Sequence, residues 1–245
     1  MKLVLRFLVP FLCIFSLTAC GVQGSYTDQL PDPADLSDPR SFEGVSDVKD
    51  LDDIEPVTDK AEPALPVELT DADGNDVTVT DASRILALDI YGTYTKTLSG
   101  LGLAENIVGR TVSSTEPNLA DLPVVTEGGH NINVEAVLEL NPTLLIVDHS
   151  IGPRDAIDQI RAAGVTTVVM EPERTIDSVG EDITTLGDAL GLPDEARELA
   201  DRSNKEIEEA REAIKELVPD DPMRMAFLYA RGNGGVFFIM GDGTG

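Results

Sequence analysis

The chain has no tryptophan, only two cysteines and only two histidines among its 245 residues, and aromatic side chains make up 4% of it. Two cysteines are too few for a disulfide-rich scaffold or a cysteine-rich zinc site, and two histidines are too few for a multi-histidine metal cage. These scarcities exclude small disulfide-stapled domains and zinc modules. The hydrophobic fraction of 42% is still sufficient for a globular core.

Positive charge is scarce as well. Lys and Arg total 18 against 45 Asp and Glu, which gives a formal net charge of −27. A surface this acidic repels phosphate backbones, so we expect no nucleic-acid partner. It also repels anionic lipid headgroups, so attachment to a membrane requires a covalent lipid or an inserted segment.

The N-terminus is typical of an export signal that ends in a lipid-attachment site. Lys2 and Arg6 precede an apolar run over residues 7–17 that is too short for a mature transmembrane helix, and the run ends in Leu-Thr-Ala-Cys-Gly. This ending is similar to a bacterial lipobox. We predict that residues 1–19 are a lipoprotein signal peptide, that Cys20 is lipidated, and that the protein is held at the extracytoplasmic face of the cell membrane. The alternative is an ordinary secretory signal that ends near a cysteine.

Residues 20–62 change character, because Asp, Pro, Ser and Gly dominate and no helical or strand periodicity survives the prolines. Low hydrophobicity with high charge does not offset the entropy of ordering, so we predict a disordered acidic tether. The acidic run would alternatively bind a cationic partner.

From residue 64 the pattern predicts an α/β domain. Two alternating runs flank an Asp-Gly turn, which indicates a β-hairpin over 66–80. Apolar strands then alternate with helices, a pattern that predicts a mostly parallel sheet with helices on both faces in a lobe over 64–192. The predicted strands are 85–88, 107–109, 143–147 and 165–169, and the predicted helices are 91–101, a helix capped by Asn131 or Asn133 that runs to 140, 154–163 and 175–190.

A long charged helix is predicted over 193–218, because opposite charges recur at helical spacing on one face. The four expected ion pairs are Glu198–Arg202, Asp201–Lys205, Glu208–Arg211 and Glu212–Lys215. A strand over 223–229 and its hairpin partner over 236–239 follow. Two strands cannot close a core, so we interpret 223–245 as the beginning of a second α/β lobe that is cut short.

Three residues stand out as candidates for a ligand site. His130 follows two glycines in a loop between a strand and a helix start, which places it at the carboxyl end of the sheet, where α/β folds bind ligands. Tyr229 and Arg231 are alternate residues of one strand and share a face. A guanidinium beside a phenol favours the phenolate, a hard anionic oxygen suited to ferric iron. His149, at the end of another strand, is the rival ligand, and Tyr91 and Tyr94 are predicted to pack in a helix.

Residues 64–245 resemble the helix-backbone (cluster-A) substrate-binding proteins of bacterial ABC importers. The sequences EGGHNINVE at 127–135 and FLYARGN at 227–233 are similar to the haem-binding lipoproteins of Gram-positive haem importers. The resemblance implies haem as the transported ligand, His130 and Tyr229 as its axial iron ligands, and Arg231 as the hydrogen-bond partner of Tyr229. It also implies an ABC permease and ATPase as partners, Glu135 as a permease contact, and cell-surface haem-binding proteins as donors.

Other functions remain open on the sequence alone. The same fold binds ferric siderophores or cobalamin in other members of the group. An exported enzyme is a different class, but the chain has no G-x-S-x-G, H-E-x-x-H or Walker motif, so we predict that it is not an enzyme. A purely adhesive lipoprotein would leave the paired His130 and Tyr229 unexplained.

Overall fold

The computed structural model describes residues 43, 54–128, 130–215, 227–231 and 235–239. The predicted signal peptide, Cys20 and most of the predicted tether lie outside the described residues. Within the described part, no helix is both long enough and apolar enough to cross a bilayer.

A four-stranded parallel sheet forms the centre of the domain, in the order β4-β3-β7-β8. Alternate residues of each strand point to opposite faces, and both faces are covered. In β3, Ile85 and Ala87 join one core cluster, whereas Leu86 and Leu88 join the other. Burial on both faces explains why these strands are continuously apolar. The strands are β3 (Ile85–Leu88), β4 (Ile107–Gly109), β7 (Leu144–Val147) and β8 (Thr166–Val169).

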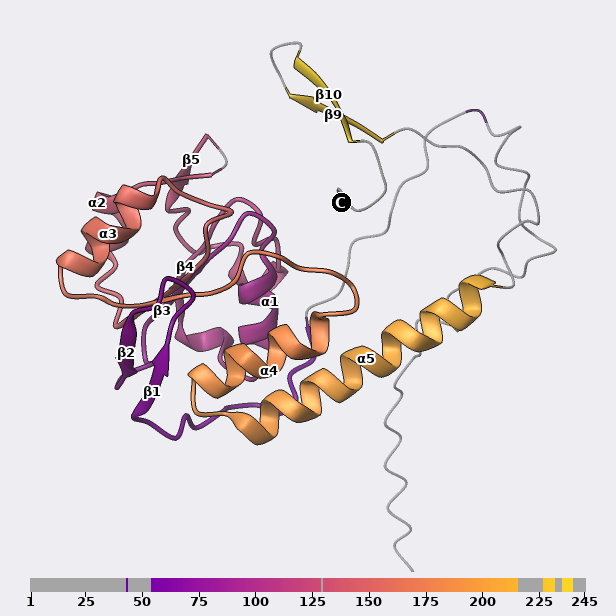
Figure 1. Cartoon of the computed structure of the whole chain (residues 1–245), viewed down its shortest axis with the longest axis horizontal. Coiled ribbons are helices and arrows are strands. Elements are labelled where there is room, and N and C mark those ends of the chain that lie inside the picture. The colour runs from indigo at the N-terminus through magenta and orange to yellow at the C-terminus, as the bar shows by residue number, and fades with distance from the viewer. Residues whose placement is uncertain (1–42, 44–53, 129, 216–226, 232–234, 240–245) are drawn as a thin grey trace, which may run out of the picture.

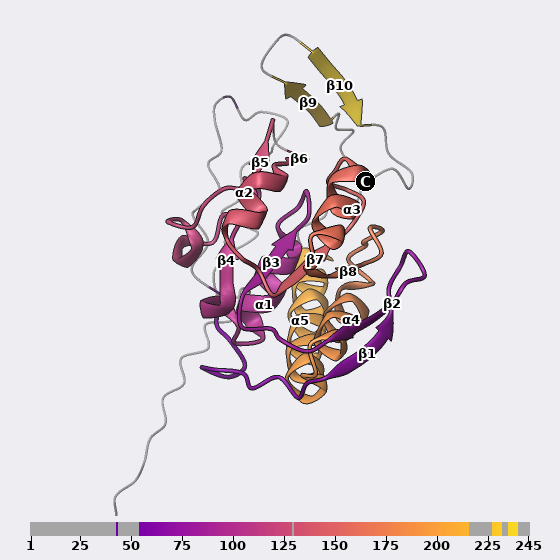
Figure 2. The same cartoon turned by 90° about the vertical axis from the view of Figure 1, so that its left-hand side faces the viewer.

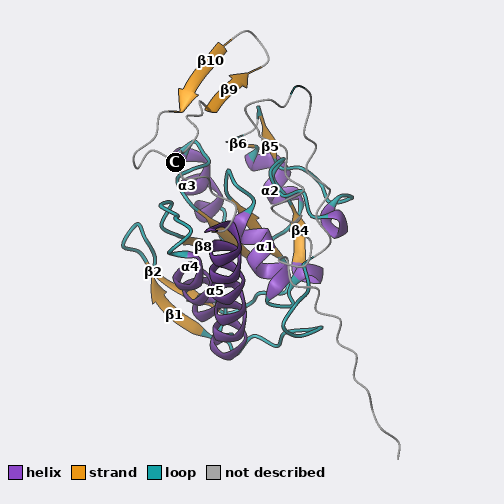
Figure 3. Cartoon of the chain, turned by 90° about the vertical axis from the view of Figure 1, so that its right-hand side faces the viewer, coloured by secondary structure: helices purple, strands orange, loops and turns teal. Residues whose placement is uncertain are grey.

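Helices cover both faces of this sheet, as the sequence predicted (Figures 1 and 3). One core contains Leu98, Leu186 and Leu199, which come from α1, α4 and α5. The opposite core contains Val137 and Ile157, which come from α2 and α3. The α/β fold class is therefore confirmed. The helices are α1 (Thr93–Gly100), α2 (Val134–Glu139), α3 (Arg154–Ala162), α4 (Val179–Ala189) and α5 (Pro193–Lys215), with 3-10 turns at Ala104–Asn106 and Pro117–Leu119.

The predicted N-terminal hairpin is confirmed as β1 (Val67–Thr70) and β2 (Asp76–Val79), which pair antiparallel. Its turn lies against the outer strand of the sheet, because the Ala72 amide donates to the Val169 carbonyl over 2.8 Å. The hairpin thus places its Asp-rich turn at the same edge of the sheet at which β8 ends.

Residues that precede the predicted boundary at residue 64 also contact this lobe. The Val57 amide donates to the carbonyl of Gly100 over 2.8 Å, the Ala61 amide donates to that of Gly102 over 3.2 Å, and Ala61 is buried. Residues 54–62 therefore contact the lobe. Composition did not reveal this contact, because it is made by backbone groups whose partners lie some forty residues further along the chain.

Helices α4 and α5 lie side by side as an antiparallel pair (Figure 1). Helix α4 begins at Val179 and not at 175, because Thr175 and Ser178 bond each other's backbone amides through their hydroxyls. Two of the four predicted ion pairs on α5, Glu208–Arg211 and Glu212–Lys215, are confirmed. The other two do not form among the described residues, because Arg202 donates to the Glu55 carbonyl and Lys205 pairs with Glu209.

A second hairpin consists of β9 (Phe227–Arg231) and β10 (Gly235–Ile239), which pair antiparallel. The first strand begins at Phe227 in the described residues, since 216–226 lie outside them. Both predicted strands of this region are therefore present, with β9 extending two residues beyond the predicted end.

Candidate functional site

Two buried carboxyl groups mark the edge of the sheet at which its parallel strands end. Asp89 directly follows β3 and Asp148 directly follows β7, and both residues are 0% exposed. The carboxyl ends of parallel strands meet at one edge, where α/β folds place their ligands. Sequence reasoning missed this pair, although an aspartate directly after each of two buried strands was a readable signal.

Arg174 compensates both carboxylates. Its Nη2 donates to Asp148 Oδ2 over 2.5 Å, and its Nη1 lies 3.8 Å from Asp89 Oδ2. Burial nevertheless raises the pKa of the Asp89 carboxyl above its ordinary value, against the hydrogen bond from the Thr93 amide and the charge of Arg174. The cluster is a charged network beneath the edge of the sheet.

The two tyrosines near this network have different environments. Tyr94 is buried, and its hydroxyl donates to Asp148 Oδ2 over 3.0 Å. Burial and the Asp148 charge raise the pKa of Tyr94, so the phenol stays neutral. Helix packing is thus confirmed for Tyr94 but is wrong for Tyr91, which is 61% exposed. The reason is that α1 begins only at Thr93, after Gly92 takes a left-handed conformation with φ of 70°, so Tyr91 precedes the helix.

His130 lies in a short hairpin and not in the plain loop that the sequence predicted. Strands β5 (Thr126–Glu127) and β6 (Asn131–Ile132) flank it and pair antiparallel. The hairpin is fastened to the segment after β7, because the Gly152 amide donates to the His130 carbonyl over 3.0 Å. Figure 2 shows this hairpin near α3, at one end of the domain.

A pocket of about 450 Å³ opens where these two segments meet, and half-buried His130 lines it. The structure therefore brings His130 to the same pocket as His149, the rival ligand. The other lining residues are Asn131, Ser150, Ile151, Gly152, Pro153 and Arg154.

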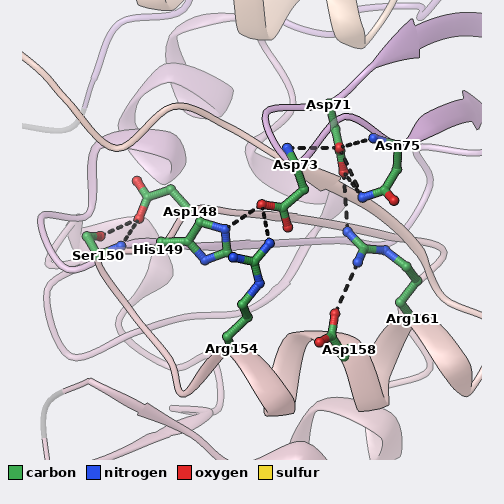
Figure 4. Close-up of polar contacts among 9 residues, drawn as sticks. All are labelled: Asp71, Asp73, Asn75, Asp148, His149, Ser150, Arg154, Asp158 and Arg161. Atoms are coloured by element: carbon green, nitrogen blue, oxygen red, sulfur yellow. Dashed lines mark hydrogen bonds and ion pairs between the residues drawn. The ribbon is translucent and has the colours of Figure 1, made fainter.

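His149 is held by a carboxylate from the β1–β2 turn (Figure 4). Its Nε2 donates to Asp73 Oδ1 over 2.8 Å, and Arg154 Nη2 contacts the same oxygen at 2.7 Å. The hydrogen bond from His149 is the main reason that the pKa of Asp73 is lowered from its ordinary value. His149 is thus already engaged by Asp73, 76 positions away in sequence, a contact that the sequence did not reveal.

Glu135 lies in the first turn of α2 and is exposed. The helix is capped by Asn133, whose side chain accepts from the Ala136 amide over 3.0 Å, which decides between the two asparagines that the sequence left open. A carboxylate at this position is favourable for the helix dipole. It is also accessible to a partner.

Tyr229 and Arg231 are both on β9, at alternate positions. Tyr229 pairs with Phe237 and Arg231 pairs with Gly235 in the hairpin register. Cys20 is outside the described residues. Of the predicted site residues, His130 and Glu135 are therefore the two whose side-chain environments the structure describes.

A parallel α/β sheet with a pocket at its carboxyl edge is the arrangement in which α/β proteins bind their ligands. The chain belongs to the periplasmic binding protein family, whose sequence profile it matches over residues 90–245. It is similar to the solved haem-binding protein HmuT, with 63% identity and a TM-score of 0.80 over 83% of this chain and 66% of that chain.

Two further relatives agree with this assignment. The periplasmic haem-binding protein RhuT from Roseiflexus sp. RS-1 is 32% identical, with a TM-score of 0.57 over 64% of this chain and 58% of that chain. The uncharacterized ABC transporter substrate-binding lipoprotein YvrC of Bacillus subtilis (strain 168) is 28% identical over 159 residues, which are 64% of this chain and 50% of that protein. The chain thus spans about half the length of this curated relative.

Proposed function

We propose that this protein is the haem-binding component of an ABC importer, which captures haem outside the membrane and passes it to a permease. The observation that carries the proposal is the position of His130, in a pocket at the carboxyl edge of the sheet, in a chain 63% identical to a haem-binding protein. Periplasmic binding proteins are non-enzymatic components of transporters, so no catalytic role is proposed.

The proposed ligand residues are supported by the variants of HmuT whose structures are solved. These carry alanine in place of a histidine, a tyrosine and an arginine. That histidine and tyrosine are separated by the same number of positions as His130 and Tyr229, and the arginine follows the tyrosine by two positions, as Arg231 follows Tyr229. We therefore propose His130 and Tyr229 as the axial ligands of haem iron, with Arg231 supporting Tyr229.

The chemistry of these side chains suits ferric haem. An imidazole and a phenolate on opposite faces make the iron six-coordinate, and the phenolate neutralises part of its charge. A guanidinium near the phenol favours its ionised form, which is the role proposed for Arg231. Since tyrosinate prefers ferric over ferrous iron, reduction of the haem iron should lower the affinity of the protein for haem.

The direct test is an absorption spectrum of the full-length protein titrated with haemin. We expect a Soret band whose position shifts in His130→Ala and in Tyr229→Ala, with the larger loss of affinity in Tyr229→Ala because the anionic ligand is lost. His149→Ala is the matched control, since His149 lines the same pocket but is held by Asp73. A double His130→Ala, Tyr229→Ala variant with the spectrum and affinity of the parent would overturn the proposal.

The sequence left a ferric siderophore or cobalamin as the alternative ligand. Competition separates these classes, because a siderophore supplies all of the iron ligands itself and needs no axial histidine. We expect that neither a ferric hydroxamate nor cobalamin, added at micromolar concentration, displaces haem from the protein. Tight binding of either compound with unchanged affinity in Tyr229→Ala would favour the alternative.

We also propose that lipid on Cys20 anchors the protein at the extracytoplasmic face of the membrane, and that the acidic segment predicted over 20–62, whose last part contacts the lobe, connects this lipid to the domain. The support is the lipobox-like sequence and the similarity to a substrate-binding lipoprotein. Cys20→Ala should move the protein from the membrane fraction to the medium or the soluble extracytoplasmic fraction. Unchanged membrane fractionation would contradict the anchor.

The proposed partners are an ABC permease and its ATPase, with cell-surface haem-binding proteins as donors. We propose that β9 and β10 begin a second lobe and that exposed Glu135 of the first lobe contacts a permease arginine. Glu135→Ala should reduce haem uptake while the haem affinity stays that of the parent. Glu139→Ala, which removes another exposed carboxylate of α2, is the control. Equal uptake in both variants would remove Glu135 from the interface.

A further inference from the structure

Tyr91 is a large aromatic residue that stands in solvent at the carboxyl edge of the sheet. It is 61% exposed, although the strand β3 just before it is completely buried. The chain is poor in aromatics and has no tryptophan, so an exposed ring at this edge is unusual for this sequence. An exposed aromatic ring beside a binding pocket offers an apolar face on which a ligand can pack.

The guanidinium of Arg174 lies over one face of the Tyr91 ring. The Cζ atom of Arg174 lies 6.0 Å from its centroid and 4.4 Å from that of Tyr94. Arg174 is itself fixed by the hydrogen bond to Asp148. One side of the Tyr91 ring therefore meets a guanidinium that is held in place, at the distance of a cation–π contact, and most of the residue is open.

The backbone next to Tyr91 is fixed as well. Gly92 has a φ of 70°, and a Cβ atom built on it would lie 2.3 Å from the carbonyl oxygen of Ser113. The segment after β3 is thus pressed against the segment after β4, at a position that only glycine can occupy without strain. The ring is presented by a backbone with little freedom to move.

Tyr91 is also adjacent to the pocket of His130. The amide of Ile90 donates to Ser150 Oγ over 3.1 Å, and Ser150 lines that pocket together with His130 and His149. Tyr91 therefore directly follows the residue whose amide bonds the pocket wall. Tyr91 does not itself line the pocket, so a ligand reaches its ring only by extending beyond the pocket along the edge of the sheet.

We infer that Tyr91 is a stacking surface for the tetrapyrrole macrocycle, and that its ring contributes affinity for a flat aromatic ligand independently of iron ligation. The inference rests on the proposed function, because it names haem as the ligand. The inference goes beyond the proposed function because it gives Tyr91 a role in specificity. The Tyr91 ring would favour planar macrocycles over non-planar iron chelates. The aromatic face, and not the phenol hydroxyl, is the group that acts.

Metal-free protoporphyrin IX tests this inference, because it offers the macrocycle without iron. Its binding to the full-length protein is followed by porphyrin fluorescence. Tyr91→Ala should bind it about tenfold more weakly, since loss of one aromatic contact and its buried area amounts to a factor of this order. Tyr91→Phe keeps the ring and should bind like the parent. Ile214→Ala, which removes an exposed apolar side chain from α5, is the matched control.

The same variants distinguish this inference from the proposed function. His130→Ala should weaken haemin binding and leave protoporphyrin IX binding unchanged, whereas Tyr91→Ala should weaken both. Equal affinity of Tyr91→Ala and the parent for protoporphyrin IX would overturn the stacking role. If Tyr91→Phe loses haemin binding but keeps protoporphyrin IX binding, the Tyr91 hydroxyl is an iron ligand. That result would also overturn the stacking role. If Tyr91→Ala weakens protoporphyrin IX binding but the haemin spectrum of the parent shows no axial ligation, the stacking role is supported and the proposed iron ligands are wrong.

Discussion

Arg174 donates a hydrogen bond to Asp148 across 2.5 Å, although the two residues are 26 positions apart. Arg174 also faces Asp89, and both aspartates are 0% exposed. Among the described residues, Asp89 Oδ1 and Arg174 Nη1 are buried without a hydrogen-bond partner. One guanidinium therefore compensates two desolvated carboxyl groups, and the balance of charge in this cluster is sensitive to both substitution and pH.

Removal of the guanidinium should be costly. Arg174→Met leaves two buried carboxylates without a counter-charge, and we expect the free energy of unfolding to fall by about 3–5 kcal/mol in urea denaturation. Arg154→Met is the control, because that side chain is 61% exposed and its ion pair with Asp73 should contribute less than about 1 kcal/mol. Equal losses of unfolding free energy in the two variants would show that the buried ion pair stabilises the fold no more than the exposed one.

The pH dependence of stability should reveal Asp89. Burial raises its pKa in the folded state above the ordinary value of 3.8, so its contribution to stability is complete below that value and declines as the pH rises through the raised pKa. Asp89→Asn keeps a neutral side chain at every pH. The variant should therefore gain stability relative to the parent as the pH is raised from about 4 towards neutrality. A difference that stays constant over this range would contradict the raised pKa.

Asp73 should titrate in the opposite sense. The hydrogen bond from His149 lowers its pKa below 3.8, so its contribution to stability is present above that value and is lost as the pH falls through the lowered pKa. In His149→Leu, the pKa of Asp73, measured by NMR, should rise towards its ordinary value. Asp81, whose pKa is lowered by hydrogen bonds from Ser83, is the internal reference and should not change.

Gly92→Ala should destabilise the fold by more than about 2 kcal/mol, because it combines the strain of a left-handed backbone with a collision at Ser113. Gly74→Ala separates these causes. Gly74 has a φ of 81° but nothing within 4 Å of a built Cβ atom, so only the backbone strain of about 1–2 kcal/mol applies. Thermal unfolding of both variants measures the difference, and a larger loss at Gly74 would contradict the assigned contact.

Asn133→Ala should cost about 1 kcal/mol, which is the usual value for loss of an N-cap. Asn131→Ala is the natural control, because this exposed asparagine was the other candidate cap and does not cap α2. Its replacement should change stability by less than about 0.5 kcal/mol. The two variants are compared by chemical denaturation, and a reversed order would assign the cap to Asn131.

The strands and most of the helices were predictable from the sequence, because their signals are local. The strand over 85–88 has the predicted bounds, since a short apolar run between turn residues is what a doubly covered strand requires. Helix starts were less certain. At α1, apolar spacing extended the prediction back to Tyr91, whereas the left-handed Gly92 delays the start to Thr93.

The contacts that build the site were not predictable in the same way. Asp73 and His149 meet across 76 positions, and Arg174 reaches Asp148 from a segment with no regular pattern. Such pairs depend on how loops from different strands converge at one edge, which composition and periodicity do not record. The single local hint was the aspartate that follows each of two central strands.

The close contact between α4 and α5 determines the direction in which the chain leaves the first domain. A Cβ atom on Gly187 would lie 2.2 Å from that of Ala196, and one on Gly180 would lie 2.4 Å from the Asn204 amide. These two contacts are eight residues apart on α5, or about 12 Å. One additional ångström of separation at Gly187 alone would tilt α5 about Asn204 by roughly 5° and move its Lys215 end by about 1–2 Å. The lack of a side chain at Gly180 and Gly187 thus determines the direction of a helix that is 23 residues long.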